Sequence, residues 1–431
     1  MSPIDRRRFL LGAAGTAALA ATSRAWGAAP VRRSDQPQLP DPASSGLDHI
    51  VVVCMENRSF DHFLGWLPGA DGKQAGLTYV DRYAVPHSTF RQSAYASCGY
   101  HDPDHSYEGG RVEYDGGRCD GWLRAGGNDD YAIGYYVRRD LAFLGQAVPQ
   151  WTTFSRYFAA ILAETYPNRI YQHAAQTDRI HNTTALCTLP TIWDRLADAG
   201  LDGRYYYSDI PFLALWGARY QPISRPYAAF EADCAAGTLP HVAFVDPRFE
   251  DEDSGTSGDD HPHADIRNGE AFMARIYEAV TTGPAWSKTV LVFNFDEWGG
   301  FFDHVPPSAA PIPPADAAAG NEDGLRGFRV PCLLVAPWAR RGAVDSTLYD
   351  HTSILRMIDD RWGLAPLTVR DAGATSLARA LTTKPNARAP QYSVPAGPFG
   401  GPCGAPSPGT SSEAEWDELR DVAAAAGWPI G

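Results

Sequence analysis

Two short apolar runs, each ending on acidic or amide side chains, constrain the fold of this chain more than any other feature. The run from 289 to 295 is rich in β-branched and aromatic residues and passes directly into the Asp296–Glu297 pair. The run from 49 to 55 passes in the same way into Glu56–Asn57. Such runs are typical of buried strands, and open α/β sheets bind ligands at the carboxyl ends of their strands. The two runs therefore predict one sheet edge that carries several oxygen ligands.

Two adjacent carboxylates repel each other, and burying one without a partner is costly or shifts its pKa until the group is neutral. For Asp296–Glu297 alone, a solvated turn after a strand is an equally good interpretation. The second acidic strand end favours a shared cation instead, because one cation would compensate both ends. Clusters of carboxylate and amide oxygens suit hard or borderline divalent cations.

Strand and helix patterns alternate along the chain as in an α/β domain. The amphipathic helix predicted over 269–282 leads directly into the strand at 289–295. Residues 66–130 lack periodicity and predict a long surface insertion or lid. We therefore predict the α/β class, with a largely parallel central sheet, helices on both faces and long loop insertions. Further helices are predicted at 141–158 with an extended end, 191–199, 350–358 and 413–426, and further strands near 205, 239 and 328.

The charge balance restricts the partners. The 431 residues include 37 basic and 51 acidic side chains, a formal net charge of -14. This balance gives no global electrostatic basis for binding nucleic acid or an anionic membrane. We therefore predict no nucleic-acid partner, and a contact with membrane surfaces that is transient, local and apolar or aromatic.

Residues 1–28 predict a twin-arginine signal peptide. Asp5–Leu10 carries an arginine pair followed by Phe and Leu, and a short apolar run comes next. That run is shorter than the ~20 apolar residues that a membrane span requires, and so is every later one. We therefore expect the twin-arginine export machinery as a partner, a linker over 29–45, and an extracellular, periplasmic or cell-wall-associated location.

The seven cysteines permit up to three disulfides with one thiol left over, as is common in exported proteins. None has the CxxC spacing of zinc-ribbon or thioredoxin-like sites. Cys54 lies within the first apolar run, so we expect it to be a thiol of the core.

Two further segments carry side chains suited to phosphate chemistry. Thr165 precedes Tyr-Pro-Asn-Arg, where a helix amino terminus would favour a bound anion, although a plain N-cap is an equally good interpretation. His261 follows the acidic loop 250–260, as a histidine near a cation or a proton-transfer site would, with an exposed acidic loop as the simpler alternative. Together with the acidic strand ends, these residues supply what metal-assisted phosphoryl transfer needs.

The chain resembles the bacterial phospholipase C and acid phosphatase phosphoesterase family. The runs ENRSFDH and GGFFDHVPP are its most specific motifs, and the similarity extends in order over roughly residues 47–365. The chain departs from the family pattern at Trp298, where a smaller or polar residue is more common, and at Glu164, which replaces the usual Pro. The segments that carry the resemblance are 56–62, 165–169, 260–262 and 296–307.

The resemblance implies an alkaline-phosphatase-like fold over residues 46–390, followed by a Pro- and Gly-rich tail with a short acidic helix over 391–431. It implies one divalent metal ion, which could be Ca, Zn, Mg or Mn. It also implies that Thr165 is the nucleophile, forming a phospho-threonine intermediate. Arg58, Arg169 and His351 lie in matching segments as well, and we expect structural or supporting roles for them. The implied metal ligands are Glu56, Asn57, Thr165, Asp296 and Glu297, and the implied phosphate-facing histidines are His105, His261 and His304.

Three functions follow as hypotheses. The leading one is a phospholipase C that hydrolyses a phospholipid diester to diacylglycerol and a phosphorylated head group. The alternative is an acid phosphatase acting on small phosphate monoesters, and a third is an inactive binding protein. A quaternary-ammonium head group would call for an aromatic cage. The aromatic residues considered for such a cage are Trp122, Tyr131, Tyr135, Tyr136 and Trp298.

Overall fold

The computed structural model describes residues 45–252, 254–401 and 413–430. Its strands are β1 His49–Met55, β2 Thr78–Val80, β3 Pro86–Ser88, β4 Phe90–Arg91, β5 Gly134–Tyr135, β6 Thr152–Phe154, β7 Tyr157–Phe158, β8 Gly203–Tyr207, β9 Ser224–Pro226, β10 Val242–Val245, β11 Thr289–Phe295, β12 Cys332–Val335, β13 Val344–Asp345 and β14 Tyr349–Asp350. Its α-helices are α1 Phe60–Leu64, α2 Tyr107–Tyr114, α3 Leu144–Ala147, α4 Thr165–Ala174, α5 Ile192–Asp198, α6 Tyr227–Ala236, α7 Ile266–Thr282, α8 Pro314–Ala319, α9 Thr352–Trp362, α10 Val369–Gly373 and α11 Glu413–Ala425.

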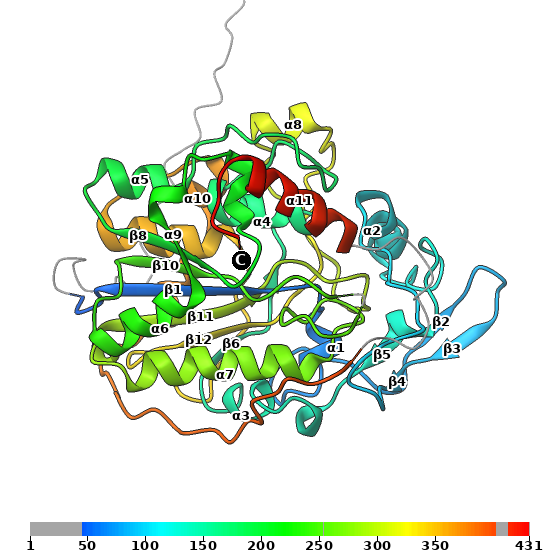
Figure 1. Ribbon diagram of the computed structural model, residues 1–431. Coiled ribbons are helices and arrows are strands. Elements are labelled where there is room, and N and C mark those ends of the chain that lie inside the picture. The colour runs from blue at the N-terminus through cyan, green and yellow to red at the C-terminus, as the bar shows by residue number, and fades with distance from the viewer. Residues whose placement is uncertain (1–44, 253, 402–412, 431) are drawn as a thin grey trace, which may run out of the picture. The chain divides into compact units, whose positions relative to one another are not determined.

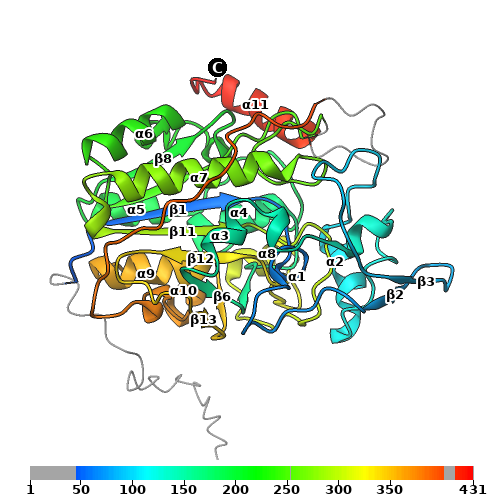
Figure 2. The ribbon, with the colours of Figure 1, turned by 90° about the horizontal axis from the view of Figure 1, so that it is seen from below.

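The core is an eight-stranded sheet with the order β13-β6-β12-β11-β1-β10-β8-β9. Most neighbouring strands are parallel, whereas β12 runs antiparallel to both β11 and β6. Helices α6 and α7 pack on one face, and α4, α5, α9 and α10 lie on the other (Figures 1 and 2). The predicted α/β class and largely parallel sheet are confirmed.

The central pair of strands explains where the polar residues gather. In the parallel ladder of β1 and β11, His49 pairs with Thr289 and Met55 pairs with Phe295. Every residue of β11 is buried, because helices cover both faces of the sheet. The two strands therefore end level with each other, and Glu56 and Asp296 leave the sheet side by side.

The order predicted for 141–158, a helix followed by an extended piece, is confirmed, although the helix is short. Only α3 forms there, and β6 and β7 follow it. Leu333 and Leu334 of β12 pair with Thr153 and Thr152, so a distant strand draws this segment into the sheet. The threonine pair is β-branched and suits the pleated surface, so pairing with β12 fixes where the helical part gives way to the extended part.

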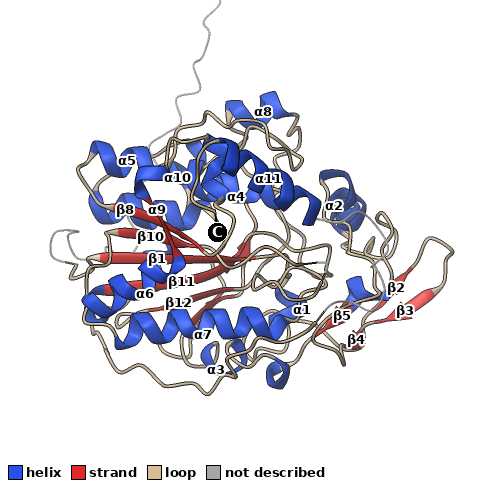
Figure 3. Cartoon of the chain, viewed as in Figure 1, coloured by secondary structure: helices blue, strands red, loops and turns tan. Residues whose placement is uncertain are grey.

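The 66–130 insertion has structure of its own. It contains β2, β3, β4 and α2, as the cartoon in Figure 3 shows. Tyr79 and Trp122 of the insertion pack in a small apolar cluster with Trp298 and Phe302, which follow the Asp296–Glu297 pair. The insertion is thus fixed to the loop at the carboxyl end of β11.

The C-terminal segments pack onto the domain. Helix α11 places the ring of Trp416 on that of Phe249, with ring centroids 3.9 Å apart and the planes 5° from parallel. Tyr392, in the Pro-rich stretch before α11, packs against Tyr277 of α7 with ring centroids 4.9 Å apart. Both segments therefore contribute to the core of the domain.

Several expectations concern thiols, export and membrane spans. Five cysteines are free and buried, among them Cys54 as expected, and Cys98 is disulfide-bonded. Within the described ranges, no helix combines the length and apolar character that crossing a membrane demands. The predicted signal peptide, residues 1–28, lies outside the described residues, as does nearly all of the predicted linker.

Candidate active site

A buried arginine joins the two acidic strand ends. The Nε atom of Arg169 donates to Glu56 Oε1 and to Asp296 Oδ2, each at 3.0 Å. Its Nη1 donates to Asp246 Oδ1 at 3.2 Å, directly after β10. Three neighbouring parallel strands therefore deliver one carboxylate each to the same guanidinium. Two carboxylate oxygens of this group have no hydrogen-bond partner among the described residues. We therefore use the name open cluster for Glu56, Asp296, Glu297, Asp246 and Arg169.

Asn57 and Thr165 lie against this cluster. The backbone N–H of Asn57 donates to Asp296 Oδ1 at 3.1 Å, and Thr165 Oγ1 donates to Asn57 Oδ1 at 3.3 Å. Thr165 is the first residue of α4, and Arg169 lies about one turn further along the same helix. One helix thus delivers both the hydroxyl and the guanidinium, and the sequence-predicted ligands converge as expected.

Glu297 is held by a tight turn. Its carboxylate accepts the N–H of Gly299 at 2.6 Å through Oε2. Gly299 has a φ of 63°, and a Cβ there would lie 2.2 Å from the carbonyl oxygen of Asn57. Only glycine satisfies both conditions. The Gly-Gly pair of the motif therefore lets the β11 loop close over the backbone at Asn57.

The open cluster is not fully satisfied by hydrogen bonds. Glu56 Oε2 and Glu297 Oε1 are buried and have no hydrogen-bond partner among the described residues. Burial raises the pKa of Glu56 well above its usual range, although Arg169 opposes the shift. Buried oxygens without partners are uncommon and call for a missing group. Carboxylate, amide and hydroxyl oxygens in one place are the donors that a hard divalent cation takes, so the residues present fit such an ion.

Two of the three predicted histidines lie beside these oxygens. His105 Nε2 is 3.9 Å from Glu297 Oε1, and the rings of His105 and His261 meet edge to face with centroids 5.9 Å apart. His261 also has a ring nitrogen within 4.8 Å of carboxylate oxygens of Glu56 and Glu252. Burial opposes the charge of His105, but the carboxylates of Glu297 and Asp102 raise its pKa to about 10.

Arg58 fixes the loop that carries His261. Its Nε donates to the carbonyl of Asp260 at 2.6 Å, and its Nη2 donates to the carbonyl of His261 at 3.3 Å. Its Nη1 donates to the hydroxyl of Tyr131 at 3.1 Å. These contacts suit the supporting role expected of Arg58, because they set the position of the histidine without reaching the open cluster.

His304 contacts a different set of carboxylates. Its Nδ1 bonds to Asp61 and its Nε2 lies 3.0 Å from Asp71 Oδ1. Asp61 and Asp303 in turn surround Arg329, whose Nη2 donates to Asp61 Oδ1 at 3.1 Å. We call Asp61, Asp303, His304 and Arg329 the closed cluster. The structure thus engages both ring nitrogens of His304 with carboxylates outside the open cluster, and its phosphate-facing role stays a prediction.

The two departures from the family pattern are accommodated by contacts within the protein. The carboxylate of Glu164 bonds to His181 Nδ1 at 3.0 Å and to the N–H of Asn182. Trp298 is fully buried and donates its indole N–H to Glu113 Oε2 at 2.7 Å. The residues considered for an aromatic cage, Trp122, Tyr131, Tyr135, Tyr136 and Trp298, are all buried.

Several site residues went unnoticed in the sequence. Asp246 follows β10 just as Glu56 follows β1, so the same rule of acidic strand ends would have found it. Arg169 was expected only to support the site, yet it contacts three of its carboxylates. Phe249 and Trp416 carry no sequence signal, but their stacked rings lie 4.7 Å and 6.0 Å from the guanidinium of Arg169.

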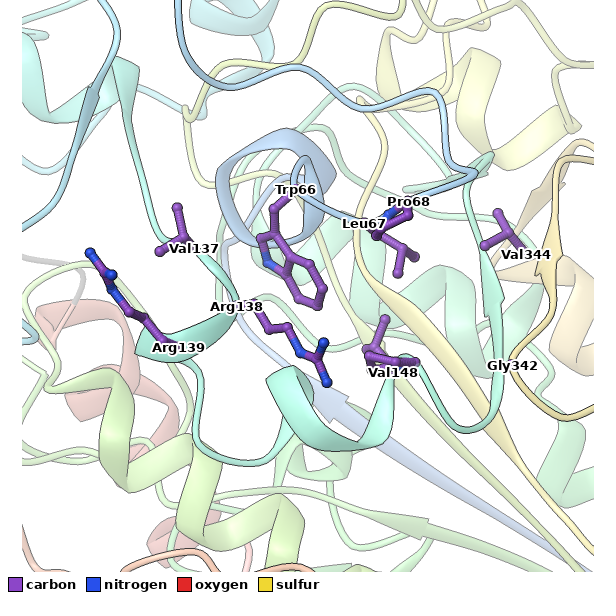
Figure 4. Close-up of a pocket in the computed structure, with 10 residues that line it drawn as sticks. Trp66, Leu67, Pro68, Val137, Arg138, Arg139, Val148, Gly342 and Val344 are labelled. Carbon is purple, nitrogen blue, oxygen red and sulfur yellow. The ribbon is translucent and has the colours of Figure 1, made fainter.

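A cavity of about 480 Å³ lies elsewhere on the domain, between the loop after α1 and the end of α3 (Figure 4). Trp66, Leu67, Val148 and Val344 supply apolar walls, and Arg138 lies below the Trp66 ring. The residues that line it include none of those predicted for the active site. Its volume falls within the ~300–1,000 Å³ of ordinary ligand sites. None of its lining residues belongs to the open cluster.

Fold and site together define a class of protein, an α/β protein with a buried, oxygen-rich site beside a threonine hydroxyl and two histidines. The model of the phosphoesterase family matches residues 47–365, and the chain belongs to this family. Non-specific phospholipase C6 of Arabidopsis thaliana is 30% identical, in an alignment that covers 77% of this chain and 71% of that protein. Phospholipase C A of Mycobacterium tuberculosis is 29% identical, in an alignment that covers 91% of this chain and 88% of that protein.

Solved structures with similar folds are much more distant. A protein of the alkaline phosphatase superfamily from Vibrio parahaemolyticus is 10% identical, with a TM-score of 0.37 over 76% of this chain and 71% of that chain. The phosphonate monoester hydrolase of Agrobacterium radiobacter is 12% identical, with a TM-score of 0.37 over 78% and 77%.

Proposed function

We propose that the protein is an exported, metal-dependent phospholipase C. The observation that carries this proposal is the position of the Thr165 hydroxyl, 3.3 Å from Asn57 Oδ1, at the start of α4 and beside buried carboxylate oxygens that lack partners. Relatives named phospholipase C, at about 30% identity over most of the chain, support the choice of substrate. The proposed metal ligands are Glu56, Asn57, Thr165, Asp296 and Glu297.

In this mechanism the Thr165 hydroxyl loses its proton to solvent, and its Oγ attacks the phosphorus of the phospholipid. The bond from phosphorus to the glycerol oxygen breaks, that oxygen takes a proton, and diacylglycerol leaves. Thr165 then carries the phosphorylated head group. Attack by water on phosphorus breaks the threonine–phosphate bond, a proton of that water returns to the threonine oxygen, and the phosphorylated head group is released. A bound divalent cation would supply a lowered pKa for the threonine hydroxyl and charge compensation for the phosphate.

The chain's own residues orient these steps. Arg169 holds Glu56 and Asp296 in register, so the open cluster keeps its shape before any ligand enters. The start of α4 favours a phosphate oxygen near Thr165 through its backbone dipoles. His105, whose ring lies beside Glu297, is placed to give a proton to the departing oxygen, and His261 beside it to hold a phosphate oxygen.

A direct assay separates this proposal from its alternatives. The purified protein is incubated with phosphatidylcholine and with a simple aryl phosphate monoester, each with and without a chelator. We expect chelator-sensitive release of diacylglycerol as the main activity. Preferred cleavage of the monoester would instead identify an acid phosphatase, and cleavage of neither substrate would leave a binding protein. Metal analysis of the active protein distinguishes Ca, Zn, Mg and Mn.

Export by the twin-arginine route is part of the proposal. Its support is the arginine pair and apolar run within residues 1–28. Replacing the pair, as Arg6→Lys with Arg7→Lys, is expected to retain the protein in the cytoplasm, as measured by cell fractionation. Unchanged export of this variant would refute the route.

A further inference from the structure

Large apolar side chains gather on one short hairpin at the surface. Strands β2 and β3 form an antiparallel pair, and the exposed fractions of the side chains at its tip are 40% for Val80, 80% for Tyr83 and 48% for Val85. The other large apolar residues exposed on the described chain, such as Leu186 and Val369, are scattered singly. Single exposed apolar residues need no explanation, whereas a cluster of them marks an interaction surface.

The base of this hairpin is anchored next to the active site. Side chains alternate along β2, so Tyr79 points inward and its neighbour Val80 points outward. The ring of Tyr79 packs 6.0 Å from that of Phe302, in the cluster that also contains Trp298. Trp298 and Phe302 belong to the loop that begins with Asp296–Glu297. The hairpin is therefore fixed to the loop that supplies two of the proposed ligands.

The charged groups at the tip are engaged within the protein. The Asp81 carboxylate accepts the N–H groups of Tyr83 and Val85, both at 2.8 Å, and lies 3.2 Å from His87 Nε2. The Arg82 guanidinium donates to the carbonyl of Gly126. The tip therefore presents apolar and aromatic surface with no net charge, on a chain whose formal charge is -14.

The hairpin lies at the same end of the domain as the candidate active site, where a phospholipid surface would present the substrate. In Figures 1 and 2, β2 and β3 lie at the end of the domain toward which β1 points. Glu56 and Asp296 are at the same end, because they follow β1 and its parallel neighbour β11.

We propose that the tip Val80–Val85 is an interfacial anchor that inserts Tyr83 and Val85 into a zwitterionic phospholipid surface beside the active site. The proposal rests on the phospholipid substrate inferred above. Tyrosine suits such an interface, because its ring is apolar and its hydroxyl stays hydrated. A second copy of the chain fits less well, since a stable protein interface buries about 800 Å² per partner and this tip exposes three large apolar side chains.

The test measures partition onto phosphatidylcholine vesicles by co-sedimentation. The full chain carrying Thr165→Ala is the parent, so that the vesicles are not consumed. Adding Tyr83→Ser and Val85→Ser is expected to lower the partition coefficient about tenfold, because apolar area no longer leaves water. The matched control adds Leu186→Ser and Val369→Ser, which remove similarly exposed side chains elsewhere, and is expected to stay within about twofold of the parent. Thermal melting checks that all variants fold.

Three outcomes would overturn the anchor. They are equal losses in the hairpin and control variants, no loss in the hairpin variant, or a parent dimer that only the hairpin variant dissociates, which would assign the tip to a second copy. Because partition is measured without turnover, a failure to hydrolyse phosphatidylcholine counts against the proposed function and not against the anchor.

Discussion

Two buried arginines hold carboxylates together in this protein, and the two clusters differ in what they leave unpaired. In the closed cluster, Arg329 Nε lies 2.9 Å from Asp303 Oδ1 and 3.1 Å from Asp303 Oδ2, and Asp61 is shared between Arg329 and His304. Every carboxylate oxygen of Asp61 and Asp303 has a hydrogen-bond donor.

The open cluster also contains a buried arginine, but hydrogen bonds do not satisfy all of its carboxylate oxygens. Arg169 reaches one oxygen of Glu56 and one of Asp296, and Glu56 Oε2 and Glu297 Oε1 stay buried without a hydrogen-bond partner among the described residues. A satisfied cluster holds the fold, and an unsatisfied one has coordination capacity left for a ligand. Between these two clusters, the difference lies in the number of satisfied oxygens and not in the presence of buried carboxylates.

The largest expected effect tests whether the open cluster is catalytic. Thr165→Ala removes the hydroxyl that contacts Asn57 Oδ1, so turnover should fall by about 10⁴-fold, as is typical when a nucleophile is removed. Metal content should be largely retained, because the carboxylates remain. Steady-state kinetics and metal analysis measure the two effects. Thr165→Ser is the control and should keep substantial activity. Near-normal turnover in Thr165→Ala would contradict the assignment of Thr165 as the nucleophile.

The next effect separates the clusters by stability. Arg329→Met leaves Asp61 and Asp303 buried without their cation, and the free energy of unfolding should drop by about 3–5 kcal/mol. Arg169→Met should destabilise the metal-free protein by a similar amount for the same reason. Added divalent metal should restore part of the stability of Arg169→Met and none of that of Arg329→Met.

Denaturant unfolding with chelator and with excess metal measures this difference. Equal rescue of both variants by metal would show that the clusters are not distinct. If either variant fails to fold at every metal concentration, Arg169→Lys and Arg329→Lys replace them in the same comparison. Both keep a positive charge and should destabilise the protein less.

Much of the fold could be predicted from the sequence, because the apolar composition of β1 and β11 indicates that both strands are buried. That Glu56, Asn57, Asp296 and Glu297 meet at one sheet edge could also be predicted, since parallel strands bring their carboxyl ends together, whereas their role as metal ligands stays a prediction. The role of His304 could not be judged in this way. Its motif adjoins the Asp296–Glu297 pair, but its ring nitrogens are taken by Asp61 and Asp71, which only the tertiary structure brings near. The point within 141–158 at which the helix ends could not be predicted either, because the strand that follows depends on a partner almost two hundred residues away.

A smaller effect tests the unpaired oxygen directly. Glu297→Gln keeps the size of the side chain and removes the charge that Oε1 would offer a cation, so metal affinity should fall by about 10–100-fold or more. The metal-free protein should keep most of its stability, because the buried charge that is removed has no hydrogen bond at Oε1 and only the 3.9 Å contact with His105. Metal titration and melting in chelator report the two effects. A marked loss of stability in chelator, with metal affinity unchanged, would assign Glu297 to the fold instead.

The smallest effect applies the same criterion to a single residue beside the nucleophile. Glu164 adjoins Thr165, but its carboxylate already bonds to His181 Nδ1 and the N–H of Asn182. A satisfied carboxylate should belong to the fold, so Glu164→Ala is expected to change kcat/KM by less than about threefold and the free energy of unfolding by about 1–3 kcal/mol. Kinetics on both substrate types, with Glu164→Gln as the control that keeps the hydrogen-bonding length, measure this. If Glu164→Ala instead lost more than about tenfold in kcat while Glu164→Gln did not, hydrogen-bond satisfaction would not separate structural from catalytic carboxylates in this protein.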